Sequence, residues 1–363
     1  MSNFEFKDSW IKTIKEHAAQ SEKDGKLHPE ILNLIYSQNW FNIYVPKAYG
    51  GLEKPLPEIL LLEEKITKAD GSTGWTVTLC SGAAWFAAFL DIELAKEIFS
   101  KPETCLAGSG AATGTATLTP NGYLINGSWK YASGALHATH FTMNCLVKNS
   151  DGYAVLDENN EELVLSFILD KKDVNIVPNW PSMGMVASGS HSFTVTNIKV
   201  PASRSFTING SLKAEAPYLN YPFLQLAEAT LAVNFLGMAL HFTELVEDLF
   251  YNRSGIERFT EDQKAFFEKE FHTQKELLLT NREQFYITVN ESWDSYIKNN
   301  SVSDELLQAV THSSRTLAHN ARKITDTLYP YCGLEAAKTQ SELNRVWRDL
   351  HTASQHSLLT FIF

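Results

Sequence analysis

The sequence predicts a mainly helical protein with a central β domain, followed by a four-helix bundle. Apolar residues recur at helical spacing up to about residue 105. From residue 106 to about 206, short alternating runs are separated by turn signals such as Asn126-Gly127. Helical spacing returns after Ser211. We therefore expect three domains, covering residues 1–105, 106–212 and 213–363.

Composition and charge limit the classes of partner. The chain carries 31 Lys and Arg against 42 Asp and Glu, so its formal net charge is −11. Such a charge repels a nucleic acid backbone and an anionic membrane surface, and we expect neither as a partner. The four cysteines lie far apart, and the N-terminal residues contain no apolar signal segment. We therefore expect a cytoplasmic protein with reduced thiols.

The N-terminal part is expected to consist of amphipathic helices. Their apolar spacing begins near Trp10. The string VPKAYGG at residues 45–51 interrupts the pattern, because proline and paired glycines favour turns. Helix resumes from Pro57 to Lys68. The weakly polar stretch from Thr76 to Leu90 is shorter than the roughly 20 residues of a membrane-spanning helix and predicts a buried helix instead.

The β part contains two motifs that suggest a ligand. The string GSGAATG at residues 108–114 is similar to a dinucleotide loop, but a β pattern follows where a helix is required. Two interpretations remain, an ordinary turn or a loop whose glycines let a ligand approach the backbone. The pair His137 and His140 would point to opposite faces of a strand and lacks a third ligand. No metal site is expected.

Four helices are expected after the β part. The first carries an apolar stripe from Leu224 to Leu249. Thr260 and Gln263 form a capping box before the second, Ser303 caps the third, and the fourth extends from Leu343 to Leu359. A neighbouring face of the first helix adds Val233, Leu236 and Leu240. This surplus of apolar surface predicts assembly with further copies of the chain.

The C-terminal segment NRVWRDLHTASQHS concentrates side chains that can perform chemistry. Two histidines, two arginines and a tryptophan lie close together at the end of an otherwise apolar bundle. In a structural account, Arg345 pairs with Asp349 one turn later and the histidines face solvent. In a functional account, a histidine serves as acid or base. Spacing alone favours the structural account, because a helical histidine more often has a structural role.

Several strings together resemble the acyl-CoA dehydrogenase superfamily over nearly the whole chain. They are VPKAYGG, TATLTPNGYLINGSWKYASGA and ASGSHSFTVTNIKVP, in the order that the family shows. The resemblance implies a helical domain, a barrel-like β domain, a four-helix bundle and a homotetramer. The strings DGSTGW, WKYASGA and WRDLHTASQH are similar to the branch of two-component flavin-dependent monooxygenases. Members of that branch receive reduced flavin from a separate reductase.

Departures from the family pattern distinguish between branches. The common dehydrogenases carry a glutamate base shortly after the Arg-Asp pair of the last helix, and Ser357 occupies about that place here. Some relatives carry the base on the first bundle helix instead, where this chain has Glu228. An acyl-CoA dehydrogenase with Glu228 as base is therefore the alternative function. A flavin-binding homologue without catalysis is the third hypothesis.

The monooxygenase resemblance implies a role for specific residues. Reduced FMN or FAD and O2 would oxygenate a small aromatic or heteroatom-containing substrate. Ser133 corresponds to a serine beside the reactive nitrogen of the flavin, and His356 corresponds to a catalytic histidine at the same edge. The predicted cofactor-binding residues are Ser133, Tyr131, Trp129, Gly134 and Trp75, and the predicted substrate-binding residues are His351 and Trp85.

Overall fold

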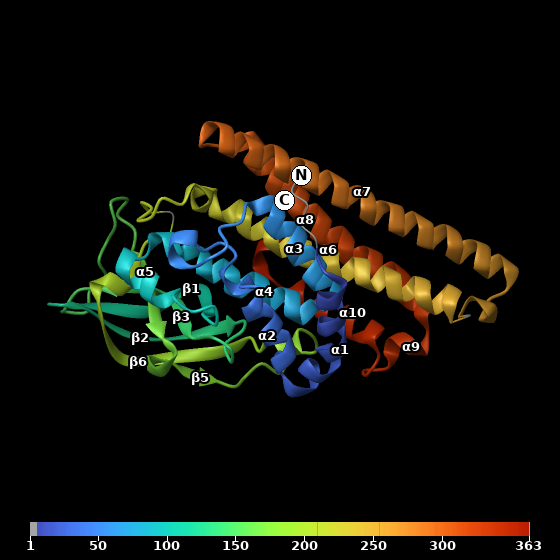
Figure 1. Ribbon diagram of the computed structural model, residues 1–363, viewed down its shortest axis with the longest axis horizontal. Coiled ribbons are helices and arrows are strands. Elements are labelled where there is room, and N and C mark those ends of the chain that lie inside the picture. Colours follow the sequence, from blue (N-terminus) through green and yellow to red (C-terminus); the bar gives the residue numbers. More distant parts are fainter. Residues whose placement is uncertain (1–5, 209, 254, 363) are drawn as a thin grey trace.

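The computed structural model describes residues 6–208, 210–253 and 255–362 (Figure 1). The expected fold class is confirmed, because helices precede and follow one central sheet. The N-terminal helices are α1 (Asp8–Asp24), α2 (Pro29–Ser37), α3 (Leu56–Ala69), α4 (Gly71–Ala84) and α5 (Ile92–Ile98). The Asp70 carboxylate accepts a hydrogen bond from the Thr73 amide and caps α4. This helix is buried on nearly all sides, as predicted, but it begins before Thr76 and ends at Ala84, and a short 3-10 helix, Trp85–Phe89, takes the place of its predicted last turns.

Seven strands form the central mixed sheet. They are β1 (Leu106–Thr119), β2 (Gly122–Ala132), β3 (His140–Lys148), β4 (Val164–Asp170), β5 (Asn175–Val177), β6 (His191–Pro201) and β7 (Ser205–Phe206). Their order is β5-β6-β2-β1-β3-β4-β7, and only the β1–β3 pair among the named pairs of the described strands is parallel. The register of β1 against β3 shifts between Ser109 and Gly114, within the glycine-rich string. A local irregularity of this kind is typical of strands beside a site.

The C-terminal part contains α6 (Phe223–Glu247), α7 (Glu261–Asn299), α8 (Asp304–Leu328), the short α9 (Leu334–Ala337) and α10 (Glu342–Ala353). The predicted caps are confirmed, since Thr260 and Gln263 form a capping box and Ser303 caps α8. The last helix ends at Ala353, earlier than the predicted Leu359. The chain then forms a separate short turn that the His356 side chain caps.

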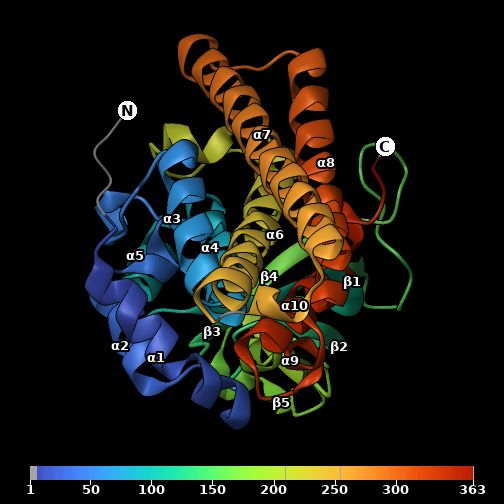
Figure 2. The same ribbon diagram turned by 90° about the vertical axis from the view of Figure 1, so that its right-hand side faces the viewer.

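Helix α6 is the central helix of the protein. Figure 1 shows α4 between the sheet and α6, with α7 on the side away from the sheet. By length and composition α6 with the turn after it could cross a membrane, but most of its apolar window is buried in the protein, where it contacts α3, α8 and α10. Figure 2 shows α7 and α8 projecting together past α6.

The second apolar face of α6, predicted to form contacts between subunits, is not available for them. Val233 and Leu236 are fully buried within the chain, and Leu240 is partly buried. The second apolar face of α6 therefore contacts other helices of the same subunit. A soluble bundle buries its central helix on all sides in this way. On α6 only Leu224, near its start, is an exposed large apolar side chain among the described residues, whereas α7 exposes Phe266, Leu277, Leu279, Ile287 and Ile297.

Candidate functional site

Two adjoining cavities lie between the sheet, α4 and the end of α10. The larger one, here called the polar chamber, has a volume of about 760 Å³ and is lined in part by Trp75, Lys130, Tyr131, Trp180 and Ser190. The smaller one, the apolar chamber, measures about 360 Å³ and is lined in part by Phe86, Met143, Phe206, Leu226 and Leu231. Leu79, Gly108, Ser109, Gly110, Ser133 and His356 line both. The two predicted catalytic residues therefore lie at the junction between the chambers.

The glycine-rich string contributes backbone to this junction. Gly108, Ser109 and Gly110 line both chambers where β1 leaves its register with β3. A Cβ atom built on Gly108 would lie 2.0 Å from the Thr142 hydroxyl, so no larger residue fits there. A Cβ atom on Gly110 would meet no described heavy atom within 4 Å. Gly108 is thus required by packing against Thr142, whereas Gly110 leaves the backbone open to a ligand, so the string combines both interpretations.

A tight turn at the end of β2 presents Ser133 to the cavity. Tyr131 has a φ of 65° and Gly134 a φ of 75°, both in the left-handed region. A Cβ atom on Gly134 would lie 2.4 Å from the Cys80 sulfur, and its amide donates to the Ser188 carbonyl at 2.7 Å. The predicted cofactor role of Gly134 is therefore corrected: it shapes the turn and does not line either chamber.

Ser133 belongs to a chain of hydroxyl groups whose direction is fixed. Ser188 donates its one hydroxyl proton to the Met185 carbonyl at 2.6 Å. Ser190, 2.7 Å from Ser188, must therefore donate to Ser188, and Ser133, 2.8 Å from Ser190, must donate to Ser190. Trp75 Nε1 donates to Ser133 Oγ at 3.2 Å. Ser133 has thus used its proton and retains a lone pair with which it can accept a further hydrogen bond.

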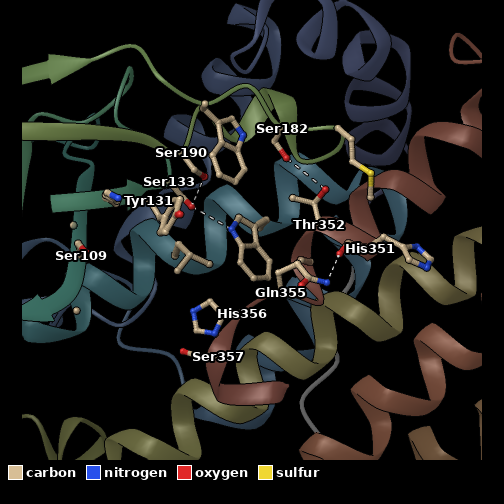
Figure 3. Close-up of a pocket in the computed structure, with 18 residues that line it drawn as sticks. Ser109, Tyr131, Ser133, Ser182, Ser190, His351, Thr352, Gln355, His356 and Ser357 are labelled. Carbon is tan, nitrogen blue, oxygen red and sulfur yellow. Dashed lines mark hydrogen bonds between the residues drawn. The ribbon is translucent and has the colours of Figure 1, made fainter. Parts of the chain in front are cut away.

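His356 faces Ser133 from the opposite wall. Figure 3 shows Ser133, Ser190 and Tyr131 on the sheet side of the cavity, with His356 and Ser357 on the C-terminal side. The His356 ring lies 5.9 Å from the Trp75 ring, and its Nδ1 accepts a hydrogen bond from the Leu358 amide at 3.4 Å. Burial lowers the pKa of His356. The neutral ring therefore carries its proton on Nε2, which is a hydrogen-bond donor.

His351, a predicted substrate-binding residue, is among the residues that line the polar chamber, but its ring does not point into it. Its backbone borders the polar chamber, but Figure 3 shows the ring turned away from His356. Nδ1 lies 2.7 Å from the Trp347 carbonyl and Nε2 lies 2.8 Å from Asp326 Oδ1. Both ring nitrogens therefore have protein partners outside the cavity.

Two predicted tryptophans also lie elsewhere. Trp129 is fully buried in the sheet core, stacks on Phe193 at 5.2 Å and donates to the Asn144 carbonyl at 2.9 Å. Trp85 is buried among Phe89, Phe223 and other aromatic rings. Neither lines a chamber, because each fills the apolar interior of its own domain. Trp75 and Tyr131 do line the polar chamber, as predicted.

The alternative base, Glu228, is not at the cavity. Its side chain is fully buried in α6 and accepts hydrogen bonds from Arg315 at 2.8 and 3.0 Å. Neighbouring residues of α6, Ala227 and Leu231, line the apolar chamber, whereas Glu228 points into the bundle. The geometry therefore does not support a dehydrogenase in which Glu228 is the base.

Several site residues were not predicted from the sequence. Ser190, Trp180, Ser182 and Gln355 line the polar chamber. Ser190 lies in the string ASGSHS, which by itself indicates only the family and the start of a strand. The available signal was the SGS string itself, in which Ser188 and Ser190 flank a glycine that can adopt a tight turn; Gly189 indeed has a positive φ.

Asp349 fastens the loop that carries several of these residues. Its Oδ1 accepts a hydrogen bond from the Met185 amide. The predicted pair of Arg345 with Asp349 is not formed as an ion pair; Arg345 lies 3.9 Å from Asp70 instead. Burial, with the nearby Asp70 carboxylate, raises the pKa of Asp349 to about 8. A neutral carboxyl group therefore joins α10 to the loop before Ser188.

Within the described part of the chain, no three His, Cys, Asp or Glu side chains form a group that could hold a metal ion. His137 Nε2 accepts a hydrogen bond from the Leu27 amide at 3.2 Å. His140 lies 3.5 Å from Asp170. The two histidines of the HxxH pair thus have separate structural partners.

Comparison with known proteins finds a family match and several relatives that are similar over most of the chain. Residues 5–92 match the N-terminal domain of acyl-CoA dehydrogenase, and residues 229–361 match its C-terminal domain. Indole-3-acetate monooxygenase of Pseudomonas putida is 23% identical over 350 residues, covering 95% of this chain and 88% of that protein. The oxygenase subunit HsaA of a flavin-dependent monooxygenase from Mycobacterium tuberculosis is 23% identical, covering 96% of this chain and 90% of HsaA.

A solved structure with the same fold contains a flavin. XiaF from Streptomyces, in complex with FADH2 and glycerol, superposes with a TM-score of 0.86. The two chains are 21% identical, and the match covers 97% of this chain and 89% of XiaF. The expected fold is thereby confirmed, and the expectation of a flavin cofactor agrees with the contents of this neighbour.

Proposed function

The chain belongs to the acyl-CoA dehydrogenase family, and we propose that it is the oxygenase component of a two-component flavin-dependent monooxygenase. The observation that carries the proposal is the meeting of Ser133 and His356 where the two chambers join. Among the residues that the structure describes, no Asp or Glu lines either chamber. A dehydrogenase needs a base beside the substrate, usually a carboxylate in this family. An oxygenase needs hydrogen-bond donors and a dry cavity instead.

The polar chamber fits a reduced flavin. Trp75 and Trp180 offer ring-sized walls, and its volume of about 760 Å³ lies in the range of cofactor sites. The free lone pair of Ser133 complements the N–H that the reactive nitrogen carries only in reduced flavin. When bound, reduced flavin reacts with O2 and supplies the oxygen atom that is transferred.

The residues of this chain have separate tasks in that chemistry. Ser133 orients the cofactor, and Trp75 and Ser190 hold the Ser133 hydroxyl in place. The Nε2–H of His356 would donate a hydrogen bond at the junction, between a flavin in the polar chamber and a substrate in the apolar one. The apolar lining excludes water, which protects a reactive oxygen species from loss.

The test supplies reduced flavin to the purified protein without oxygen and then admits O2 with an aromatic probe such as indole. We expect oxygenated product and little hydrogen peroxide. Oxidation of an acyl-CoA that Glu228→Ala abolishes would establish the dehydrogenase function instead. Flavin binding without product from any probe would support a non-catalytic homologue.

The proposal includes a flavin reductase partner, a homotetramer and a cytoplasmic location. Support for assembly comes from α7, whose exposed apolar residues include Phe266, Leu279 and Ile287. The four cysteines are unpaired and buried, which is usual for a cytoplasmic protein. Light scattering should report a tetramer, and Leu279→Glu with Ile287→Glu should reduce it to a smaller species. A wild-type monomer at micromolar concentration contradicts the assembly.

A further inference from the structure

We propose that the apolar chamber is the substrate site, and that it selects an uncharged compound of two or three fused rings and rejects ring compounds that carry a carboxylate. This inference rests on the proposed function and adds the class of substrate. Its basis is the composition of the chamber wall. Within residues 6–208, 210–253 and 255–362, no Lys, Arg, Asp or Glu lines it.

The walls come from four parts of the fold and are largely carbon. Phe86 follows α4, Met143 lies on β3, Phe206 on β7, and Leu226 and Leu231 on α6. These elements pack into the protein core, so the wall is rigid. A volume of about 360 Å³ holds roughly a dozen non-hydrogen atoms, if each needs about the 30 Å³ of a liquid water molecule. This number of atoms corresponds to two or three fused rings.

A small polar group lies in the wall of the chamber. Ser166 donates its hydroxyl proton to Asn144 Oδ1 at 2.6 Å, and Asn144 Nδ2 donates to the Gly110 carbonyl at 2.9 Å. The Asn144 amide nitrogen has a second proton, which is available to a ligand. Both residues line the apolar chamber. A neutral heteroatom of the substrate can therefore receive a hydrogen bond without a charge.

A carboxylate has no counterion in this chamber. His356 is the one residue at the junction that could become a cation, and burial disfavours its charged form. Lys130 lines the polar chamber only. An anion buried without a partner loses its hydration and gains nothing in return. The chamber should therefore discriminate strongly between two ligands that share a ring system and differ in a carboxylate.

Indole and indole-3-acetate form such a pair of probes. We expect the protein to bind indole at least about a hundred-fold more tightly than indole-3-acetate, measured by calorimetry on the protein as purified. Leu358 lies beside His356 and is only partly buried, so a longer side chain is tolerated there. Leu358→Lys should raise the affinity for indole-3-acetate relative to indole, and Leu358→Gln is the matched neutral control. Equal affinity of the wild-type protein for both probes would overturn the inference.

Gly82 allows an independent test of the site itself. It lines the apolar chamber but not the polar one, and a Cβ atom built there meets no described heavy atom within 4 Å. Gly82→Leu should therefore fill the chamber, and Gly82→Ala should fill it less. We expect a graded loss of indole affinity, about ten-fold or more for leucine, with unchanged affinity for reduced flavin.

The outcomes separate the two proposals. Unchanged indole binding in Gly82→Leu would show that the ring binds elsewhere, even if the protein is an oxygenase. Selective indole binding without any oxygenated product would leave the chamber as assigned and refute the proposed function.

Discussion

The hydroxyl of Ser133 donates its proton to the hydroxyl of Ser190, 2.8 Å away. The direction follows from the Met185 carbonyl at the far end of the chain, which can only accept. Ser133 therefore meets the cofactor as an acceptor. Reduced flavin has an N–H at its reactive nitrogen, whereas oxidised flavin has only a lone pair there. The serine chain thus favours the reduced cofactor.

Ser188→Ala should weaken this preference. Without the Ser188 oxygen, Ser190 can donate to Ser133, and Ser133 can donate to oxidised flavin. We expect the ratio of the dissociation constants for oxidised and reduced flavin to fall about ten-fold, the worth of one hydrogen bond. Anaerobic titration with each form measures the ratio. Ser182→Ala is the control, because Ser182 lines the same chamber but pairs with Thr352. An unchanged ratio in Ser188→Ala would contradict the assigned direction.

The order of helical and β segments was predictable because local sequence patterns determine it. Period-2 alternation in SFTVTNIKVP produced β6, and the Thr260 capping box produced the start of α7. The end of α10 was not predictable, since the segment after Ala353 contains neither glycine nor proline. The short turn that follows, Ser357–Leu359, is stabilised by the His356 side chain, whose Nδ1 accepts a hydrogen bond from the Leu358 amide.

The candidate site was only partly predictable. The family resemblance singled out Ser133 and His356, and the structure brings both to one junction. Trp129 and Trp85 were predicted at the site but lie in the apolar interior. A tryptophan fills a protein core as readily as it lines a cofactor site, and its place in the sequence does not distinguish these two roles. The direction of the serine chain depends on contacts between segments far apart in the sequence, so no local pattern could reveal it.

His356→Ala should reduce oxygenation by about a hundred-fold, the usual effect of losing a group that donates or accepts a proton. Its Nδ1 also caps the final turn, so a structural loss must be separated from a chemical one. His356→Asn serves this purpose, because asparagine is a good cap but not an acid or base. We expect both variants to bind flavin and to release more hydrogen peroxide per O2 consumed. His351→Ala should leave the product yield near that of the wild type.

The pH dependence of oxygenation should reflect the neutral form of His356. Burial lowers its pKa from the ordinary value of 6.5, so the ring becomes charged only at a more acidic pH. Protonation of Nδ1 would break the hydrogen bond from the Leu358 amide that orients the ring. The rate should therefore stay level as the pH falls from 8 to about 6.5 and decline only below that range. Rapid mixing of the reduced, flavin-loaded protein with oxygenated buffers gives the profile. A decline centred above pH 6.5 in the wild type, or one that persists in His356→Asn, would assign the titration to another group.

Stability should depend on pH through Asp349. Its folded pKa of about 8 lies above the ordinary 3.8, so the folded state retains a proton that the unfolded state has lost. By linkage, stability falls as the pH rises from about 4 to about 8 and is then constant. Asp349→Asn keeps an acceptor for the Met185 amide and cannot ionise, so its free energy of unfolding should fall less over this interval. Asp349→Ala leaves that buried amide unpaired and should be about 2 kcal/mol less stable than Asp349→Asn at either pH, since neither variant can ionise there. Urea unfolding of the wild type and both variants at pH 5 and pH 8 measures these differences. If Asp349→Asn loses as much stability as the wild type between the two pH values, Asp349 is already ionised in the folded protein.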